Sequence, residues 1–155
     1  MRILITAGPT REFLDTVRFI SNPSSGKMGY ALAAAGVARG HDVVLVSGPT
    51  SLKLPAGVKA IHVISAAQMA AAAKKAFAAV DAAIFTAAVC DYRPAMRMDR
   101  KLKKKNQRMV LNLEPTEDIA ASLGRRKGRR ITIGFAMEDH EHRRFAADKL
   151  LRKRC

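Results

Sequence analysis

A chain of 155 residues is long enough for a single domain with a real hydrophobic core. Its formal net charge of +15, most of which lies after residue 96, favours anionic partners: nucleotides, nucleic acid or an anionic surface. No apolar run approaches the roughly 20 residues of a membrane span, two cysteines are too few for a disulfide framework, and no signal segment begins the chain, so we expect a cytoplasmic protein.

Short apolar runs alternate with alanine-rich segments over the first half of the chain. Strands are expected at residues 2–7, 41–47, 58–64 and 81–88, of which the first and the fourth are expected to be buried. Helices are expected at 26–39, ending at Gly40, and at 66–80, capped by Ser65. This alternation predicts the α/β class, with a Rossmann-like, doubly wound, mostly parallel sheet and helices on both faces.

The remaining segments are shorter or more polar. Residues 8–12 are rich in turn formers and follow the first strand, at the sheet edge where ligands bind in open α/β folds. The second half is expected to hold two further strands and two helices. These are a short strand at 109–113, a helix from about 114 to 124, a final buried strand at 131–136 and a basic helix at 141–154.

The loop before the first helix has the composition of an anion site. Small residues at Ser24, Ser25 and Gly26 allow close backbone approach, and Lys27 adds a positive charge at a helix N-terminus. The spacing is not that of a Walker A loop, and no Gly-x-Gly-x-x-Gly turn is present. An ordinary turn closed by an N-cap serine is an equally good interpretation.

Three other polar residues have two interpretations each. Asp91 follows the fourth strand at the ligand-binding edge, where it could hold magnesium or a ribose hydroxyl, or could simply be a turn residue before Pro94. Arg11 and Arg18 could each bind a carboxylate or phosphate, although solvated surface arginines are commoner.

The basic run at 97–105 is either a solvated segment, a nucleic-acid patch or a mobile flap over a phosphorylated ligand. The absence of interleaved aromatic residues disfavours the nucleic-acid interpretation, so no specific nucleic-acid partner is expected. A metal site is also disfavoured at the acidic and histidine-containing stretch 138–142, because the spacing matches no standard site. That stretch reads Glu138, Asp139, His140, Glu141, His142.

Several separated motifs together resemble one family, the phosphopantothenoylcysteine synthetase domain of coenzyme A biosynthesis, also called phosphopantothenate–cysteine ligase. The run Ser24-Ser25-Gly26-Lys27-Met28-Gly29, preceded by Ser21 and Asn22, is the most specific. The other matching stretches occur in family order, at 5–11, 17–22, 46–49, 87–93, 101–104 and 134–136. The resemblance covers nearly all of residues 1–155 and implies one ligase domain with a flap at about 94–108.

This resemblance implies a ligase that activates the carboxylate of 4′-phosphopantothenate with a nucleoside triphosphate, expected to be CTP, using Mg²⁺. Cysteine then displaces the nucleotide to form an amide. Asn22 and Lys101 are implied as catalytic, Arg18 and Asn22 as substrate-binding, and Asp91 as a tentative metal ligand. The implied nucleotide contacts are Ser24, Ser25, Gly26, Lys27, Met28, Gly29, Phe85, Thr86, Ala87, Asp91, Glu117, Asp118, Ile119, Ala120, Phe135, Lys149 and Lys153.

The family also implies a homodimer, with the flap near the subunit contact, and often an N-terminal flavin-dependent decarboxylase as fusion or partner. FMN is thus expected only in that separate domain. Three departures stand out: Cys90 replaces an alanine, 116–119 reads Thr-Glu-Asp-Ile, and the family continues with further strands after Cys155. The alternatives are a non-catalytic nucleotide- or polyanion-binding Rossmann-like module and, less favoured, a nicotinamide-dependent reductase.

Overall fold

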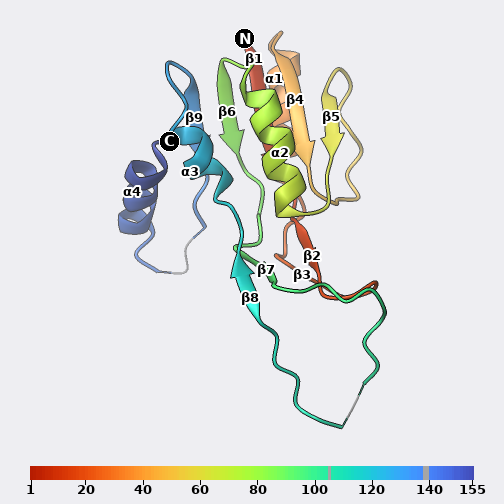
Figure 1. Cartoon of the computed structure of the whole chain (residues 1–155). Helices are drawn as coiled ribbons and strands as arrows, with labels where there is room; N and C mark the ends of the chain where they lie inside the picture. Colours follow the sequence, from red (N-terminus) through yellow and green to blue (C-terminus); the bar gives the residue numbers. More distant parts are fainter. Residues whose placement is uncertain (105, 138–139) are drawn as a thin grey trace.

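A five-stranded parallel sheet forms the centre of the computed structural model, which describes residues 1–104, 106–137 and 140–155 (Figure 1). The strands stand in the order β5 (Lys59–His62), β4 (Asp42–Ser47), β1 (Arg2–Ala7), β6 (Ala82–Phe85) and β9 (Ile131–Gly134). Every neighbouring pair is parallel, and β1 lies in the middle with Leu4 opposite Val44 and Ala83. The predicted doubly wound parallel sheet is confirmed.

The order of the strands creates a crevice at the carboxyl edge of the sheet. From β1 the chain runs through α1 (Lys27–Ala38) to β4 and outward to β5. It then returns through α2 (Ala66–Phe77) to β6, on the other side of β1. Because the connections after β1 and after β6 lead away in opposite directions, the loops at this reversal leave room for a ligand.

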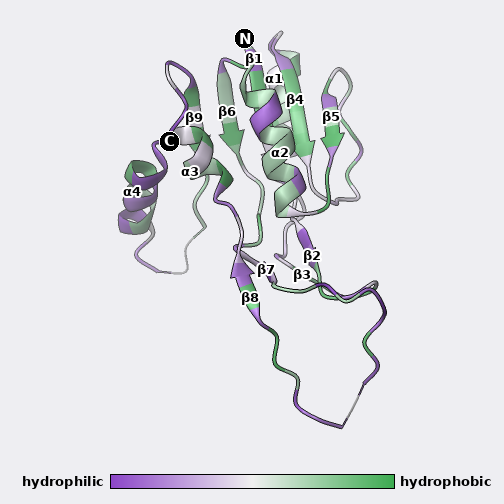
Figure 2. Ribbon diagram, viewed as in Figure 1, coloured by the Kyte–Doolittle hydropathy of each residue, from purple (hydrophilic) through white to green (hydrophobic). Residues whose placement is uncertain are grey.

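Helices cover both faces of the sheet, as predicted. Ile5 and Leu45 pack on one face with Tyr30 of α1. Leu4 packs on the other face with Met69 of α2 and Leu123 of α3 (Ile119–Gly124). The central strands β1, β4 and β6 are largely hydrophobic along their length (Figure 2). Because adjacent strand residues point to opposite faces, these continuous apolar runs supply both cores at once.

The helix ends follow the sequence signals. The Ser65 side chain accepts from the Gln68 backbone N–H at 3.2 Å, and the Gln68 side chain accepts from the Ser65 N–H at the same distance, which completes a capping box for α2. Gly40, just after α1, has a φ of 77°, which favours glycine. The helix α2 ends at Phe77, three residues earlier than the predicted end at 80.

Two antiparallel strand pairs at the carboxyl edge were not predicted. The expected turn segment 8–12 leads into a hairpin of β2 (Arg11–Phe13) and β3 (Phe19–Ser21). The second pair joins β7 (Tyr92–Pro94) to β8 (Leu113–Pro115). Three-residue strands are too short to show a period in the sequence, because their pairing partners and not their own pattern define them.

Three predicted boundaries in the second half are wrong. Of the strand expected at 109–113, only Leu113 lies in a strand of the structure. Leu113 pairs with Pro94 of β7, whereas the exposed residues 109–112 belong to no described strand. The helix expected from 114 begins at Ile119, after the Asp118 cap, since Glu114 and Pro115 belong to β8. The final strand β9 ends at Gly134 and buries only Thr132, because it lies at the edge of the sheet. The basic helix is confirmed as α4 (His142–Lys153).

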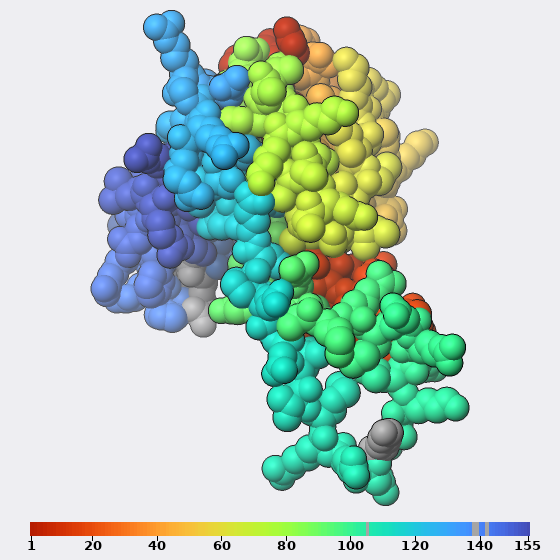
Figure 3. All heavy atoms as spheres, in the orientation of Figure 1, coloured from red at the N-terminus to blue at the C-terminus, as the bar shows by residue number. Residues whose placement is uncertain are grey.

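A long arm leaves the body between β7 and β8 (Figure 3). We call residues 95–112 the arm; it contains most of the predicted flap, whose Lys105 lies outside the described residues. Its surface mixes charged and apolar side chains, with Met96 65% and Val110 86% exposed. No described helix is long and apolar enough to cross a membrane.

Arg130 closes the C-terminal end of α2. Its Nε donates to the Val80 carbonyl at 3.1 Å and one terminal nitrogen to the Ala78 carbonyl at 3.2 Å, while the guanidinium lies 5.1 Å from the centre of the Phe77 ring. Both carbonyls come just after the helix, where positive charge also complements the helix dipole.

We expect Arg130→Ala to lower the free energy of unfolding by about 1–2 kcal/mol, because two carbonyls and a ring face lose their partner. Urea unfolding measures the change as a lower midpoint at constant slope. The exposed neighbour Arg129→Ala is the matched control for loss of one positive charge. Equal midpoints for the two variants would contradict this role of Arg130.

Candidate active site

A large hollow lies at the carboxyl edge of the sheet, beyond β6 and β9, with a volume of about 1010 Å³. Its walls come from α3, α4, the segment after β6 and the loop before α1. This volume is at the upper end of the range for small-molecule sites. Fourteen of the predicted site residues line it: Asn22, Ser24, Met28, Phe85, Thr86, Ala87, Asp91, Glu117, Asp118, Ile119, Ala120, Phe135, Lys149 and Lys153.

Asn22 lies where the loop before α1 meets the segment after β6. Its side-chain Nδ2 donates to the backbone carbonyls of Val89, at 3.0 Å, and Ala88, at 3.4 Å. Carbonyl oxygens only accept, so the amide nitrogen must be the end that faces them. The Asn22 Oδ1 therefore has no hydrogen-bond partner in the part of the chain that the structure describes, and Asn22 lines the hollow.

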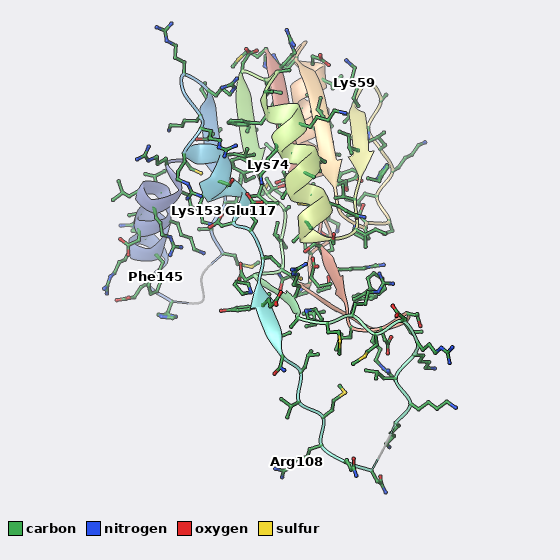
Figure 4. All side chains as sticks on the ribbon, in the orientation of Figure 1. Lys59, Lys74, Arg108, Glu117, Phe145 and Lys153 are labelled. Carbon is green, nitrogen blue, oxygen red and sulfur yellow. The ribbon has the colours of Figure 1, made fainter. Side chains whose placement is uncertain are left out.

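Two ion pairs hold the entrance to α3. The Lys153 Nζ lies 3.2 Å from the Asp118 Oδ2, and the Lys74 Nζ lies 2.7 Å from the Glu117 Oε2 (Figure 4). Burial opposes ionisation of Asp118, but the Ala121 N–H and the Lys153 charge lower its pKa below the ordinary value. The pKa of Glu117 is lowered chiefly by its hydrogen bond from Lys74. The lowered pKa values keep both acids anionic, so each is matched to the lysine it pairs with beside the hollow.

The predicted anion loop is divided between two hollows. Ser24 lines both, Met28 lines the large one, and Ser25 and Lys27 line a second hollow of about 580 Å³ together with Arg11. The interpretation of this loop as a turn closed by an N-cap serine is wrong, because Gly26 is the N-cap of α1 and no side chain caps it.

Two glycines of this loop shape the backbone and do not contact a hollow. Gly26 has a φ of 76°, in the region that favours glycine. A Cβ at Gly29 would stand 2.4 Å from the Ala7 Cβ and 2.6 Å from the Thr86 Oγ1. Only glycine allows α1 to begin this close to β1 and β6, so the specific Gly-Lys-Met-Gly pattern fixes how the helix meets the sheet.

Asp91 is an exposed carboxylate in the wall of the hollow, and its backbone carbonyl accepts from the Thr116 N–H at 2.8 Å. No group of three or more His, Cys, Asp or Glu side chains suited to a metal occurs among the described residues. In the stretch 138–142, Glu138 and Asp139 lie outside the described residues, while the His140 ring packs edge-on against Phe145 at 5.1 Å between centres.

The whole chain, residues 1–155, matches the family described as the DNA/pantothenate metabolism flavoprotein C-terminal domain. The chain belongs to this family. It is 47% identical over 152 residues to the coenzyme A biosynthesis bifunctional protein CoaBC of Bacillus subtilis strain 168, covering 97% of this chain and 37% of that protein. A crystal structure of the C-terminal domain of CoaBC superimposes with a TM-score of 0.89 and 46% identity, over 99% of this chain and 73% of that one.

A further relative of this flavoprotein C-terminal domain is a cysteine/cysteine sulfinic acid decarboxylase from an unknown prokaryotic organism. It is 48% identical over 154 residues, which cover 98% of this chain and 43% of that protein. The chain thus spans less than half the length of these two curated relatives. The family and the Rossmann-like fold are therefore established by the comparisons, and the resemblance drawn from the sequence motifs is confirmed.

Besides Gly26 and Gly29, two residues predicted for the site of this flavoprotein C-terminal domain do not line either hollow. Lys101 is exposed on the arm. Arg18, at the end of the turn between β2 and β3, directs one terminal guanidinium nitrogen to the Asp15 carboxylate at 2.7 Å and to the Leu102 carbonyl at 2.9 Å. Their predicted roles in catalysis and substrate binding remain predictions.

The sequence reasoning missed several residues of the large hollow. Thr116 donates a short hydrogen bond to the Cys90 carbonyl and so joins the strand end of β8 to the segment after β6. Cys155 lines the hollow beside Gly134, and burial raises the pKa of its thiol. Of α4, Ala146 and Ala147 line it as well as the two predicted lysines. The only sequence signal for this face of α4 was the i, i+4 spacing of Lys149 and Lys153, which puts both lysines on one side of a helix.

Proposed function

We propose that this flavoprotein C-terminal domain is a ligase that joins 4′-phosphopantothenate to cysteine in coenzyme A biosynthesis. The observation that carries the proposal is the large hollow, in which a family-specific asparagine, a carboxylate and two lysines from three separate segments face one space at the carboxyl edge of the sheet. Membership of the family and 46% identity to the C-terminal domain of CoaBC support the same reaction.

The proposed reaction has two steps. In the first, a carboxylate oxygen of phosphopantothenate attacks the α-phosphorus of CTP, the bond to the β-phosphate oxygen breaks, and pyrophosphate leaves. In the second, the cysteine amine attacks the acyl carbon, the acyl–oxygen bond breaks, and CMP leaves with the electron pair while the amine loses a proton. Negative charge develops on oxygen in both steps, so fixed positive charges and hydrogen-bond donors accelerate them.

The residues of the hollow suit these needs. Lys149 and Lys153, on one face of α4, would bind the triphosphate, and Ser24 and Lys27, at the start of α1, would also bind a phosphate of the nucleotide. Asp91 would hold Mg²⁺ by a single carboxylate, which is how this ion is commonly bound when substrate phosphates supply the other ligands. Bound Mg²⁺ would neutralise charge on those phosphates.

Asn22 would act in the amide-forming step through its Oδ1. Its two N–H donors are directed to the Val89 and Ala88 carbonyls, so the group left for a ligand is an acceptor. An acceptor suits an amine or amide N–H of the acyl intermediate or of cysteine. This differs from the usual use of asparagine as an oxyanion donor.

Lys101 would enter the site from a second copy of the chain. The arm that bears it projects from the body (Figure 3), Lys101 lines neither hollow of its own chain, and the arm exposes apolar side chains, including Met96 and Val110. A homodimer that covers these side chains would bring one arm to the partner's site. A flavin-dependent decarboxylase, bearing FMN, is the proposed N-terminal fusion or partner of this domain.

Pyrophosphate release tests the proposal directly. The purified protein is incubated with Mg²⁺ and CTP or ATP, with and without phosphopantothenate and cysteine. We expect release that requires phosphopantothenate, that is faster with CTP, and that continues beyond one turnover only when cysteine is present. Tight, salt-sensitive nucleic-acid binding with no CTP binding would instead support the polyanion-binding module.

A further inference from the structure

A fully buried carboxylate lies outside both hollows, at the turn between β2 and β3. Asp15 has no solvent-accessible surface, although it belongs to a short exposed hairpin. A buried charge is costly unless hydrogen bonds and an opposite charge compensate it. The hydrogen-bond donors around Asp15 therefore show which segments its carboxylate connects.

The Asp15 carboxylate accepts four hydrogen bonds. Its Oδ1 accepts from the backbone N–H groups of Val17 and Arg18, both at 2.7 Å. Its Oδ2 accepts from the Arg18 guanidinium at 2.7 Å and from the Leu102 backbone N–H at 3.0 Å. Four bonds use the full acceptor capacity of a carboxylate, so Asp15 has none left for a substrate.

Three of these donors belong to the hairpin itself, and the fourth belongs to the arm, 87 residues later. The Arg18 nitrogen that binds Asp15 also donates to the Leu102 carbonyl at 2.9 Å, so both backbone polar groups of Leu102 are held by the Asp15–Arg18 pair. The same limb of the arm contacts the hairpin through the Met98 N–H, which donates to the Leu14 carbonyl at 2.8 Å, and through Arg97 over the Phe13 ring.

We call the contact of the Asp15–Arg18 pair with Leu102 the anchor, and its place in the arm indicates its role. Leu102 is the residue next to Lys101, the lysine proposed to act in amide formation. With the Leu102 backbone fixed at both its N–H and its carbonyl, the Cα of Lys101 has a defined place, and only its side chain remains to be ordered. A catalytic group that is positioned in advance avoids the entropy cost of ordering at the reaction.

We propose that Asp15 is the positioning residue of the arm, which holds Leu102 on the β2–β3 hairpin and thereby sets the place of Lys101 for the amide-forming step. The second half of this statement rests on the proposed function. The backbone N–H of Arg18, the other hydrogen bonds and the ion pair keep the pKa of Asp15 far below its usual range despite burial, so the anchor is charged at all ordinary pH values.

Asp15→Asn is the informative substitution. It keeps the size of the side chain but replaces one accepting oxygen with an NH₂ donor, which must face either the Leu102 N–H and Arg18 or the two hairpin N–H groups. The matched control is Glu114→Gln, which removes the exposed ion pair between Glu114 and Arg93 at the base of the arm, 3.2 Å long. Both variants lose one acidic charge from the same region.

The hydrogen-exchange rate of the Leu102 backbone amide tests the contact with Asp15 independently of enzyme activity. We expect the Leu102 amide to exchange at least about tenfold faster in Asp15→Asn than in the parent, because it loses a hydrogen bond to a charged acceptor. Exchange in β1 and β4 is expected to stay unchanged, as is Leu102 exchange in Glu114→Gln. Equal Leu102 exchange in the parent and in Asp15→Asn would overturn the inference, whatever the enzyme does.

Kinetics then separates positioning from mere folding. In Asp15→Asn, pyrophosphate release in the first turnover is expected at the parental rate, with amide formation at least tenfold slower. Equal slowing of both steps, or amide formation at the parental rate, would overturn the positioning role. If the variant does not fold, Leu102→Pro removes the N–H donor on the arm's side of the contact and also restricts the backbone of Lys101, and it must likewise slow amide formation more than pyrophosphate release. A parent that releases no pyrophosphate would refute the proposed function, while the exchange result would still decide the anchor.

Discussion

Co-expression of Asn22→Asp and Lys101→Ala subunits is expected to restore amide formation to about a quarter of the parental rate, although each variant alone forms almost none. In a two-fold symmetric dimer whose arm reaches the partner, a mixed dimer has one site with both substitutions and one site with neither. Random pairing makes about half of the dimers mixed, so about one site in four is intact.

Each variant alone is expected to lose roughly a hundredfold or more in amide formation, while it still releases pyrophosphate in the first turnover. Asn22→Asp would stall because a negative charge then faces the Val89 and Ala88 carbonyls, which accept the present amide N–H groups. Two differently tagged Asn22→Asp subunits, co-expressed and purified through both tags, are the control. Absence of recovery in mixed dimers of Asn22→Asp with Lys101→Ala would show that each arm serves its own site.

Lys153→Gln is expected to raise the KM for the nucleotide at least about tenfold with a smaller effect on kcat, since a charge that binds the triphosphate contributes to the ground state and the transition state alike. Lys153 is the less exposed partner of its ion pair, with a quarter of its side chain accessible, and it lines the hollow. Steady-state kinetics with varied CTP measures the change.

Lys59→Gln provides the control, because Lys59 forms a similar ion pair with Asp42 at the start of β5, far from the hollow (Figure 4). Both pairs are partly exposed, and exposed pairs contribute little to stability, so neither variant should lose more than about 1 kcal/mol of unfolding free energy. A Lys153→Gln enzyme with the KM of Lys59→Gln would mean that α4 does not contact the nucleotide phosphates.

The main elements of the fold could be predicted because each has a signal in its own residues. The strands β1, β4 and β6 are continuous apolar runs, and α2 has its cap signal in Ser65. The segment 24–29 was recognisable for a similar reason, because its glycines are needed for the local backbone geometry. Gly29, for example, lies so close to Ala7 that a Cβ would not fit. Such local constraints act within a few residues, which is the range that a sequence pattern reports.

What the sequence by itself determined is therefore the α/β class, the parallel strands and the family-specific loop that carries Asn22. Only the tertiary structure decided that α4 joins α3 and the segment after β6 around one hollow, that β9 is an exposed edge, and that Asp15 holds Leu102 across 87 residues. The physical reason is that a buried charge or an edge strand depends on partners distant in the chain. The residues next to Asp15 in the sequence carry no pattern that predicts its hydrogen bond from Leu102, because that donor lies 87 residues away.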